Sequence, residues 1–312
     1  MEGRAVDART CKGGALNSLE TIKLEAFELT LQDIATVEIE RLHALSIGVG
    51  WPHRPTDWQM LLDIGEGVVA VDEIGRLAGS AMWFNYDEKY ATTGMVITAH
   101  RLQKRGAGRW LMDYAVTQIG SRKLVLNATS EARRLCQPLG LTAQKTIYQC
   151  QGEAFALAPP DMPRGATLRE LGNFDLAGVA DLDFAAYGAD RSILISSLLK
   201  VSSGVVLIRA GRVEAFSLCR PFGRGVLIGP VIAFNDEDAI AVTYPHFRTH
   251  KGGFVRLDTG QQTGAFSQYL IHAGLPVFDF VTAMVTGDNI VPTINDRPRP
   301  ATVYALACLA FG

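Results

Sequence analysis

Hydrophobic positions along the chain change their spacing sharply near residue 100. Residues 95–98 form a short apolar run that is partly β-branched, which is typical of a buried strand. Farther on, apolar side chains recur three or four residues apart, as on one face of a helix: Trp110, Leu111, Tyr114, Ala115 and Ile119. A basic, glycine-bearing segment separates the two patterns. The sequence therefore predicts a strand, a loop and a helix in immediate succession.

The loop between this strand and this helix has the composition of an anion-binding site. Gly106 and Gly108 let the backbone turn tightly and bring successive N–H groups together at the helix N-terminus. Four cationic side chains surround the turn and could contact a phosphorylated ligand: Arg101, Lys104, Arg105 and Arg109. An ordinary solvated basic loop is the alternative interpretation. The glycine spacing differs from that of the P-loop and of the dinucleotide fingerprint, so it supports neither nucleotide hydrolysis nor nicotinamide binding.

The surrounding pattern predicts a mixed α/β unit that ends near Cys150. Before the loop we expect two helices, over about residues 32–45 and from about residue 57, and strands over 27–31, 68–71, 77–84 and 90–98. After it we expect a strand over 123–126, a short helix from Ser130 and a last strand over 145–150. Residues 151–165 contain three prolines and are typical of a linker.

The pattern then repeats, which predicts two copies of one fold. Thr30-Leu-Gln-Asp-Ile34 recurs as Thr167-Leu-Arg-Glu-Leu171, and Gly67-Val-Val recurs as Gly204-Val-Val, each 137 residues later. We expect a loosely ordered tail over residues 1–25, a first domain over 26–151, a linker over 152–165 and a second domain over 166–312.

The two copies differ at the loop. The second reads Phe234-Asn-Asp-Glu-Asp-Ala239, with no glycine loop and with three carboxylates where a phosphate would have to lie. We expect these carboxylates to cap a helix and to repel phosphate. A cofactor should therefore bind only the first copy.

Composition limits the other possibilities. In 312 residues the formal net charge is −2, so the chain as a whole is not attracted to nucleic acid or to an anionic membrane. The five cysteines are widely spread, which predicts reduced thiols in a cytoplasmic protein. The six histidines are scattered, so no metal site is expected. Neither a signal peptide nor a membrane-spanning run is visible.

Two motifs resemble those of the GNAT acyltransferase superfamily. Gln103, Gly106 and Gly108 lie on the positions of its acyl-CoA loop, Q/R-x-x-G-x-G/A. Leu126-Asn-Ala-Thr129 and then Leu135-Cys-Gln-Pro-Leu-Gly-Leu141 are similar to the ending L-x-A-T…L-Y-x-x-L-G-F. With the degenerate second copy, the chain resembles a group of bacterial tandem GNAT proteins. That resemblance implies two GNAT-like domains of mixed α/β (α+β) class, each a mostly antiparallel sheet flanked by helices.

The resemblance also implies acetyl-CoA, or another acyl-CoA, as co-substrate. The strand before the loop would bond the pantetheine arm and the thioester carbonyl, and the loop would hold the pyrophosphate. The expected cofactor contacts are Val96, Ile97, Thr98, Gln103, Lys104, Arg105, Gly106, Ala107, Gly108, Arg109 and Asn127.

The implied reaction is direct attack of an amine on the thioester. An alkylammonium has a pKa of about 10.4 and must first lose a proton. No base identifies itself, because each candidate is also a plausible turn, cap or ion-pair residue: Glu88, Asp87, Asp183, Asp190 and Asp258. Cys136 occupies the position at which many members place a tyrosine that protonates the leaving thiolate. It could replace that acid, or it could be a small buried core thiol.

Four residues follow the first helix of their copy, the region that lines the acceptor groove in this superfamily: Trp51, Tyr187, Asp190 and Arg191. Trp51 could instead be a packing residue. Asp190 and Arg191 could instead form a helix cap and a surface ion pair. The expected function is N-acylation of a small amine or an amino-acid-like acceptor. A non-catalytic acyl-CoA-binding sensor and an O-acyltransferase stay open, and the protein should be a monomer or a homodimer.

Overall fold

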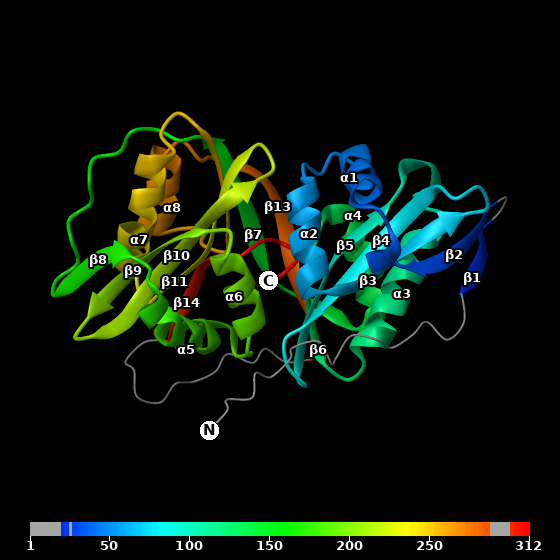
Figure 1. The fold of residues 1–312 in the computed structure, drawn as a ribbon, viewed down its shortest axis with the longest axis horizontal. Helices are drawn as coiled ribbons and strands as arrows, with labels where there is room; N and C mark the ends of the chain where they lie inside the picture. The colour runs from blue at the N-terminus through cyan, green and yellow to red at the C-terminus, as the bar shows by residue number, and fades with distance from the viewer. Residues whose placement is uncertain (1–19, 25–26, 288–299) are drawn as a thin grey trace, which may run out of the picture.

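The computed structural model describes residues 20–24, 27–287 and 300–312. The strands join in one sheet, and helices cover both of its faces (Figure 1). We call residues 20–153 the first half and residues 166–312 the second half. The mixed, mostly antiparallel architecture confirms the predicted fold class, because β5–β6 and β11–β12 are the only parallel pairs among the described strands.

The first half begins with β1 (Thr21–Leu24), which pairs with β2. Its elements continue as β2 (Phe27–Asp33), η1 (Ile34–Thr36), α1 (Ile39–Gly48), α2 (Pro55–Ile64), β3 (Glu66–Asp72), β4 (Leu77–Asn85), β5 (Tyr90–Thr98), η2 (His100–Leu102), α3 (Ala107–Ile119), β6 (Lys123–Ala128), α4 (Ser130–Cys136), η3 (Gln137–Leu139) and β7 (Leu141–Glu153). Residues 21–24, which we expected in a loosely ordered tail, are therefore a strand.

The second half follows the same order. Its elements are β8 (Ala166–Glu170), η4 (Asn173–Asp175), α5 (Leu176–Tyr187), α6 (Ser192–Leu199), β9 (Ser203–Arg209), β10 (Arg212–Phe222), β11 (Gly225–Ala233), α7 (Asp236–Thr249), β12 (Phe254–Thr259), α8 (Ala265–His272), β13 (Val277–Thr286) and β14 (Thr302–Ala305).

The predicted starts of the first two helices were misplaced. Gln32 belongs to β2, and α1 begins only at Ile39, after a 3-10 turn that the Asp33 side chain caps. Pro55 opens α2, and Asp57, in its first turn, accepts a hydrogen bond from the Arg54 N–H at 2.8 Å. A proline suits the first helical position because the N–H that it lacks has no intrahelical partner there.

The two halves exchange their late strands. The central part of the sheet runs β6–β13–β7–β12, so β13 of the second half pairs with β6 of the first, and β7 of the first pairs with β12 of the second. In register, Thr282 faces Ala128 and Gln149 faces Asp258. Neither half could therefore complete its own sheet without the other.

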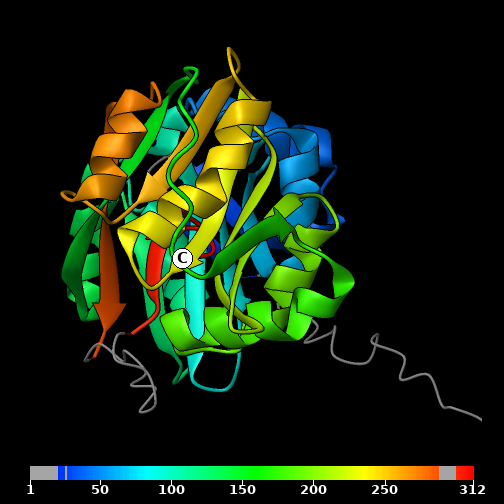
Figure 2. The same ribbon diagram turned by 90° about the vertical axis from the view of Figure 1, so that its left-hand side faces the viewer.

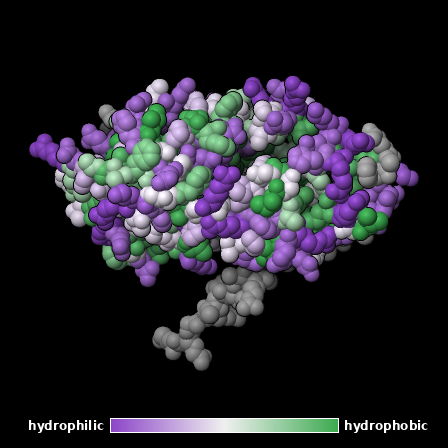
Figure 3. Space-filling model, turned by 90° about the horizontal axis from the view of Figure 1, so that it is seen from above, coloured by the Kyte–Doolittle hydropathy of each residue, from purple (hydrophilic) through white to green (hydrophobic). Residues whose placement is uncertain are grey.

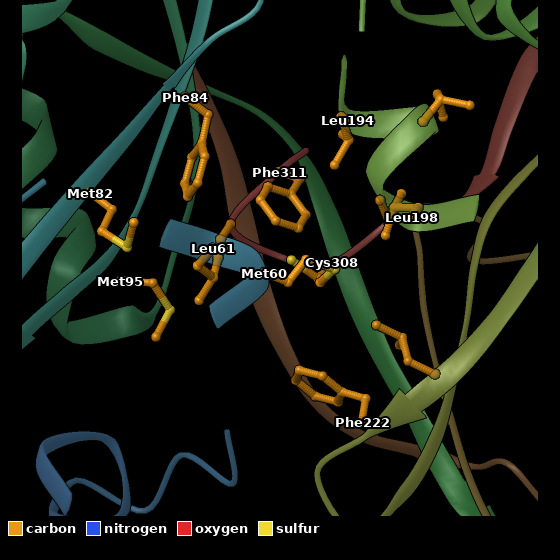
Figure 4. Close-up of a cluster of buried hydrophobic side chains, with 14 of the residues drawn as sticks. Met60, Leu61, Met82, Phe84, Met95, Leu194, Leu198, Phe222, Cys308 and Phe311 are labelled. Carbon is orange, nitrogen blue, oxygen red and sulfur yellow. The ribbon is translucent and has the colours of Figure 1, made fainter. Parts of the chain in front are cut away.

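A hydrophobic core lies where the halves meet. Side chains from β4 and β5, from α2 and from α6 pack together with residues near the C-terminus, including Phe84, Leu61, Met95, Leu198 and Phe311 (Figure 4). The opposite face of the first half packs under α3 and α4. In the second half, α7 and α8 lie on one side of the strands and α5 and α6 on the other (Figure 2).

No helix in the described residues is long and apolar enough to cross a membrane. The four described cysteines, Cys136, Cys150, Cys219 and Cys308, are buried and make no disulfide. Cys11 lies outside the described residues.

Candidate active site

Strands β5 and β6 diverge and leave a wedge between them. They pair over only three positions, from Tyr90 with Lys123 to Thr92 with Val125. Beyond Thr92, β5 pairs with β4 alone, and the register between them shifts between Ser80 and Met82. The shift marks a β-bulge, which bends the strand. The edge of β5 from Val96 to Thr98 therefore faces the wedge without a pairing strand.

Met95 holds the bulge in place. Its φ of +51° lies in the left-handed region, which costs a residue with a side chain about 1–2 kcal/mol. Two contacts offset this cost. The Met95 side chain is 3% exposed in the shared core, and its carbonyl accepts a hydrogen bond from Ser80 Oγ at 2.7 Å.

The glycine loop leads from the wedge into α3. Gln103 Nε2 donates to the Thr98 carbonyl at 3.1 Å, which ties the loop to the end of β5. Gly106, the N-cap of α3, has φ +97°. A Cβ on Gly108 would lie 2.9 Å from Thr98 Oγ1, so only glycine fits there without displacement. The first N–H groups of α3 have no intrahelical acceptors, and they point toward the loop.

The cations around this loop are unequal. Arg101 is ion-paired with Asp72 at 3.2 Å, and Arg109 with Asp113 at 2.7 Å. Lys104 is exposed and takes φ +64° within the turn. Because Arg109 and Asp113 are both about two-fifths exposed (39% and 45%), an incoming phosphate could compete for Arg109 at little cost.

Residues 306–312 occupy the narrow end of the wedge. The carbonyls of Leu309, Ala310 and Phe311 accept hydrogen bonds from Asn127 Nδ2 (2.9 Å), Thr92 Oγ1 (3.0 Å) and Tyr86 Oη (2.6 Å), in that order. A Cβ on Gly94 would lie 2.7 Å from the Ala310 Cβ, so Gly94 permits this close approach.

A cavity of about 240 Å³ adjoins the wedge and is lined by residues of both halves. The α1–α2 connection forms one wall, the β10–β11 turn forms another, and the exchanged strands β7 and β13 form the floor together with β12. Gly94, Met95 and Asn127 line the end that meets the wedge. Seen from above, the surface is hollowed near its middle, where the halves meet (Figure 3).

His53 lies in the cavity wall among aromatic rings. Its ring centroid is 5.3 Å from that of Phe222 and 6.1 Å from that of Trp51. Burial, and then the positive charges of Arg256 and Arg220, lower the pKa of His53 to about 3. The imidazole is therefore neutral at physiological pH. Its Nδ1 is shielded from solvent and has no hydrogen-bond partner among the described residues.

The chain is similar to known acetyltransferases in two comparisons. A family model described as an acetyltransferase (GNAT) domain matches residues 179–297. The uncharacterized N-acetyltransferase YitH of Bacillus subtilis (strain 168) is 25% identical over 191 residues, which cover 60% of this chain and 66% of that protein. Both similarities are to acetyltransferases, and the family model identifies a GNAT domain within the second half.

Solved structures share this fold over most of the chain. A Pyrococcus horikoshii protein described as an acetyltransferase superposes with a TM-score of 0.72 at 16% identity, covering 96% of this chain and 100% of its own. A tandem GNAT protein from the clavulanic acid biosynthesis pathway gives 0.61 at 12% identity, with 84% and 100% covered. The family model matches only the second half, whereas the glycine loop typical of GNAT proteins lies in the first.

Of the four expected acceptor contacts, the structure brings Trp51 alone to the cavity. Arg191 is 2% exposed and is bound bidentately by Asp183, at 2.8 and 3.0 Å. It stacks on Tyr187, whose hydroxyl donates to the Gly312 carbonyl at 3.0 Å. Asp190 accepts from the Ser192 N–H at the start of α6. Tyr187 and Arg191 thus tie α5 to the C-terminal segment, and Asp190 caps α6, so the structure does not bring these three residues to the cavity.

The expected acid and bases also lie outside the cavity lining. Cys136 is buried in the core beneath α3 and α4, and burial raises the pKa of its thiol to about 11. Glu88 is exposed in the β4–β5 turn, seven residues before Met95, which is roughly 20 Å along an extended strand. Asp87 caps the same turn by accepting from the Lys89 and Tyr90 N–H groups. Asp258 is buried and pairs with Arg256.

Sequence reasoning missed the polar residues of the cavity. His53 stands two residues after Trp51, and Arg256 lies on β12, but their neighbours come from distant segments. Asp279, Gln149 and Gln151 reach the cavity floor because β7 and β13 cross between the halves. Only the exchanged strand pairing, which no local pattern specifies, could have identified them.

Proposed function

We propose that this protein transfers an acyl group, acetyl by default, from an acyl-CoA to the primary amine of a small or amino-acid-like acceptor. One observation carries the proposal: the wedge beside β5 meets the glycine loop at one end and the cavity at the other. A CoA thioester lying along β5 would have its pyrophosphate at the start of α3 and its acyl group at the cavity.

The first half would hold the cofactor. The edge of β5 from Val96 to Thr98 has no pairing strand on the wedge side, and its free backbone groups suit the amides and the carbonyl of an acylated pantetheine. The N–H groups at the start of α3 suit the pyrophosphate, because phosphate binds well at helix N-termini. Lys104, Arg105 and Arg109 add positive charge at the same place.

The second half would shape the acceptor cavity and leave the cofactor to the first. Phe222, Arg224 and Arg256 come from this half and line the cavity. The amine attacks the thioester carbonyl, a C–N bond forms, and the C–S bond breaks to release CoA. One proton leaves the attacking nitrogen, and the thiolate takes up another.

The different roles of the two halves also support the proposed domain boundaries and the proposed oligomeric state. Residues 26–151 and 166–312 would act as one unit, because their exchanged strands complete the sheet within a single chain. A monomer therefore suffices, although a homodimer remains compatible with this arrangement. The four buried free thiols support a cytoplasmic location.

A steady-state assay of CoA release with a panel of small primary amines tests the proposal. We expect turnover that needs both acetyl-CoA and an amine, and a mass increase of one acetyl group on that amine. Tight acetyl-CoA binding without release across the panel would contradict the enzyme and favour the sensor. An acetylated hydroxyl in place of the amine would show O-acylation.

A further inference from the structure

We infer that the acceptor carries a carboxylate as well as its amine, with the amine placed at Asp279 and the carboxylate near Arg224 and Arg256. The inference rests on the proposed function and adds the class of acceptor. It begins from the floor of the cavity, which presents opposite charges at its two ends.

The sheet register sets the order of these charges. Asp279 on β13 faces Gln149 on β7, and Gln151, on the same face of β7, is opposite Arg256 on β12. Since β13 adjoins β6 and β12 is two strands farther away, Asp279 lies on the wedge side. Two strand spacings separate Asp279 from Arg256 by about 10 Å across the sheet. Because the arginine side chain is long, its guanidinium group can come closer to Asp279 than this backbone distance, so that a small molecule could contact both.

Asp279 can bind an amine. It is exposed, and its one hydrogen bond in the described structure is accepted from the adjacent Phe280 N–H at 2.8 Å, through Oδ1. No cationic side chain of the described residues is ion-paired with it, so Oδ2 is available to an acceptor amine next to the wedge.

The opposite end can bind an anion. Arg256 uses Nε and Nη2 to bind Asp258, at 2.9 and 3.0 Å, and its Nη1 has no acceptor among the described residues. Arg224 is exposed beside the Phe254 ring, and no described carboxylate is ion-paired with it. Two guanidinium groups against one buried carboxylate leave this end positive, which suits the planar, bidentate geometry of a carboxylate.

The other lining residues and the volume of the cavity indicate the polarity and size of the acceptor side chain. Trp51, Phe222, Phe254 and Phe278 give it largely apolar walls, and Phe278 is 68% exposed at the rim. The volume of about 240 Å³ lies below the range typical of drug-sized ligands. His53 adds a neutral imidazole ring to the wall. An amino acid with an apolar side chain combines these features.

The test compares three acceptors that share one side chain. L-Leucine carries both charges, L-leucinamide lacks the carboxylate charge, and 3-methylbutylamine lacks the whole group. We expect the KM for L-leucine to be about tenfold lower than for either analogue, as one charge-assisted contact would give. Arg224→Gln should raise the KM for L-leucine about tenfold and so remove most of its advantage over the analogues. The KM for 3-methylbutylamine should stay within twofold of that of the unmodified protein.

Arg212→Gln is the matched control, because it removes one exposed positive charge from the same half outside the cavity lining. It should leave all three KM values unchanged. Asp279→Asn should lower kcat/KM for all three acceptors alike, since all three carry the amine, and should leave acetyl-CoA affinity unchanged.

The outcomes separate this inference from the function on which it rests. Equal KM values for the three acceptors, an equal effect of Arg224→Gln on all three, or turnover of other small amines but of none of these three would overturn the carboxylate site. Binding of acetyl-CoA without turnover of any amine would instead overturn the proposed enzyme. Loss of acetyl-CoA binding by the unmodified protein would overturn the proposed function itself.

Discussion

The two halves build the same wedge and fill it differently. In the first, β5 and β6 part after Thr92, and the free edge of β5 leads into a glycine loop. In the second, β11 and β12 pair at only two positions, but β14 adds to the free edge of β11, with Val231 facing Ala305 and Ala233 facing Thr302. A strand of the chain itself thus lies where a pantetheine would have to bind.

The helices that follow the two wedges, α3 and α7, also begin differently. Gly106 caps α3, whereas Asn235 caps α7 by accepting from the Asp238 N–H at 2.9 Å. The next residue, Asp236, accepts from the Tyr304 hydroxyl at 2.8 Å and from the Phe266 N–H at 3.0 Å. The carboxylate therefore anchors β14 and α8. One half thus leaves the edge of β5 open, and the other covers the corresponding edge of β11 with β14.

Removing the side chain at the narrow end of the first wedge should have the largest effect. Phe311 is fully buried and packs edge to face on Phe84, with ring centroids 4.9 Å apart. We expect Phe311→Ala to lower the free energy of unfolding by about 3–5 kcal/mol, as for other buried aromatic truncations. Denaturant titration measures this loss. Phe174→Ala, at a residue 78% exposed, should cost less than about 1 kcal/mol, and equal losses would contradict the shared core.

Blocking the glycine loop should abolish cofactor binding without unfolding the protein. Gly106→Glu adds bulk and negative charge where the pyrophosphate would lie, so acetyl-CoA affinity should fall at least about 100-fold, or roughly 2.7 kcal/mol. Gly211→Glu is the matched control, because Gly211 also has positive φ, at +75°, in a turn with open space around it. Equal affinity in both folded variants would refute the position of the loop site.

Each half holds a buried neutral histidine, which makes stability depend on pH. Burial lowers the pKa of His53 to about 3 and that of His246 to about 4, against an ordinary value of about 6.5. Between pH 6.5 and 4 the unfolded chain therefore binds more protons, and stability is lost as pH falls. The slope approaches about 1.4 kcal/mol per pH unit for each histidine.

Replacing both histidines, as His53→Gln with His246→Gln, should flatten this dependence. Unfolding midpoints measured across pH 4 to 6.5 would show it. A double variant whose midpoint falls as steeply as that of the parent would show that other groups cause the loss.

The smallest effect is expected where β14 meets α7. Tyr304→Phe removes the hydrogen bond to Asp236 and leaves a partly buried carboxylate with one partner fewer, which should cost about 1–2 kcal/mol of stability. Acetyl-CoA affinity should not change. A measurable drop in affinity would mean that the second wedge takes part in cofactor binding.

Local patterns allowed the loop and the repeat to be predicted, because both depend on residues close together in sequence. Gly106 and Gly108 follow a strand and open a helix as expected. Pairing between the halves was not predictable, since the apolar alternation of β7 or β13 fits either neighbour equally well. The cavity depends on that pairing, and so do Asp279 and Arg256. Arg191 misled the sequence analysis because its partner Asp183 lies on the preceding helix, where the pair becomes buried.

We expect the first wedge to bind acyl-CoA and the second wedge not to bind it. Calorimetric titration of the purified protein with acetyl-CoA measures this directly, as the number of sites per chain. We expect one site. Two sites would show that β14 does not close the second wedge, and no binding would show that the open edge of β5 and its glycine loop do not form a cofactor site.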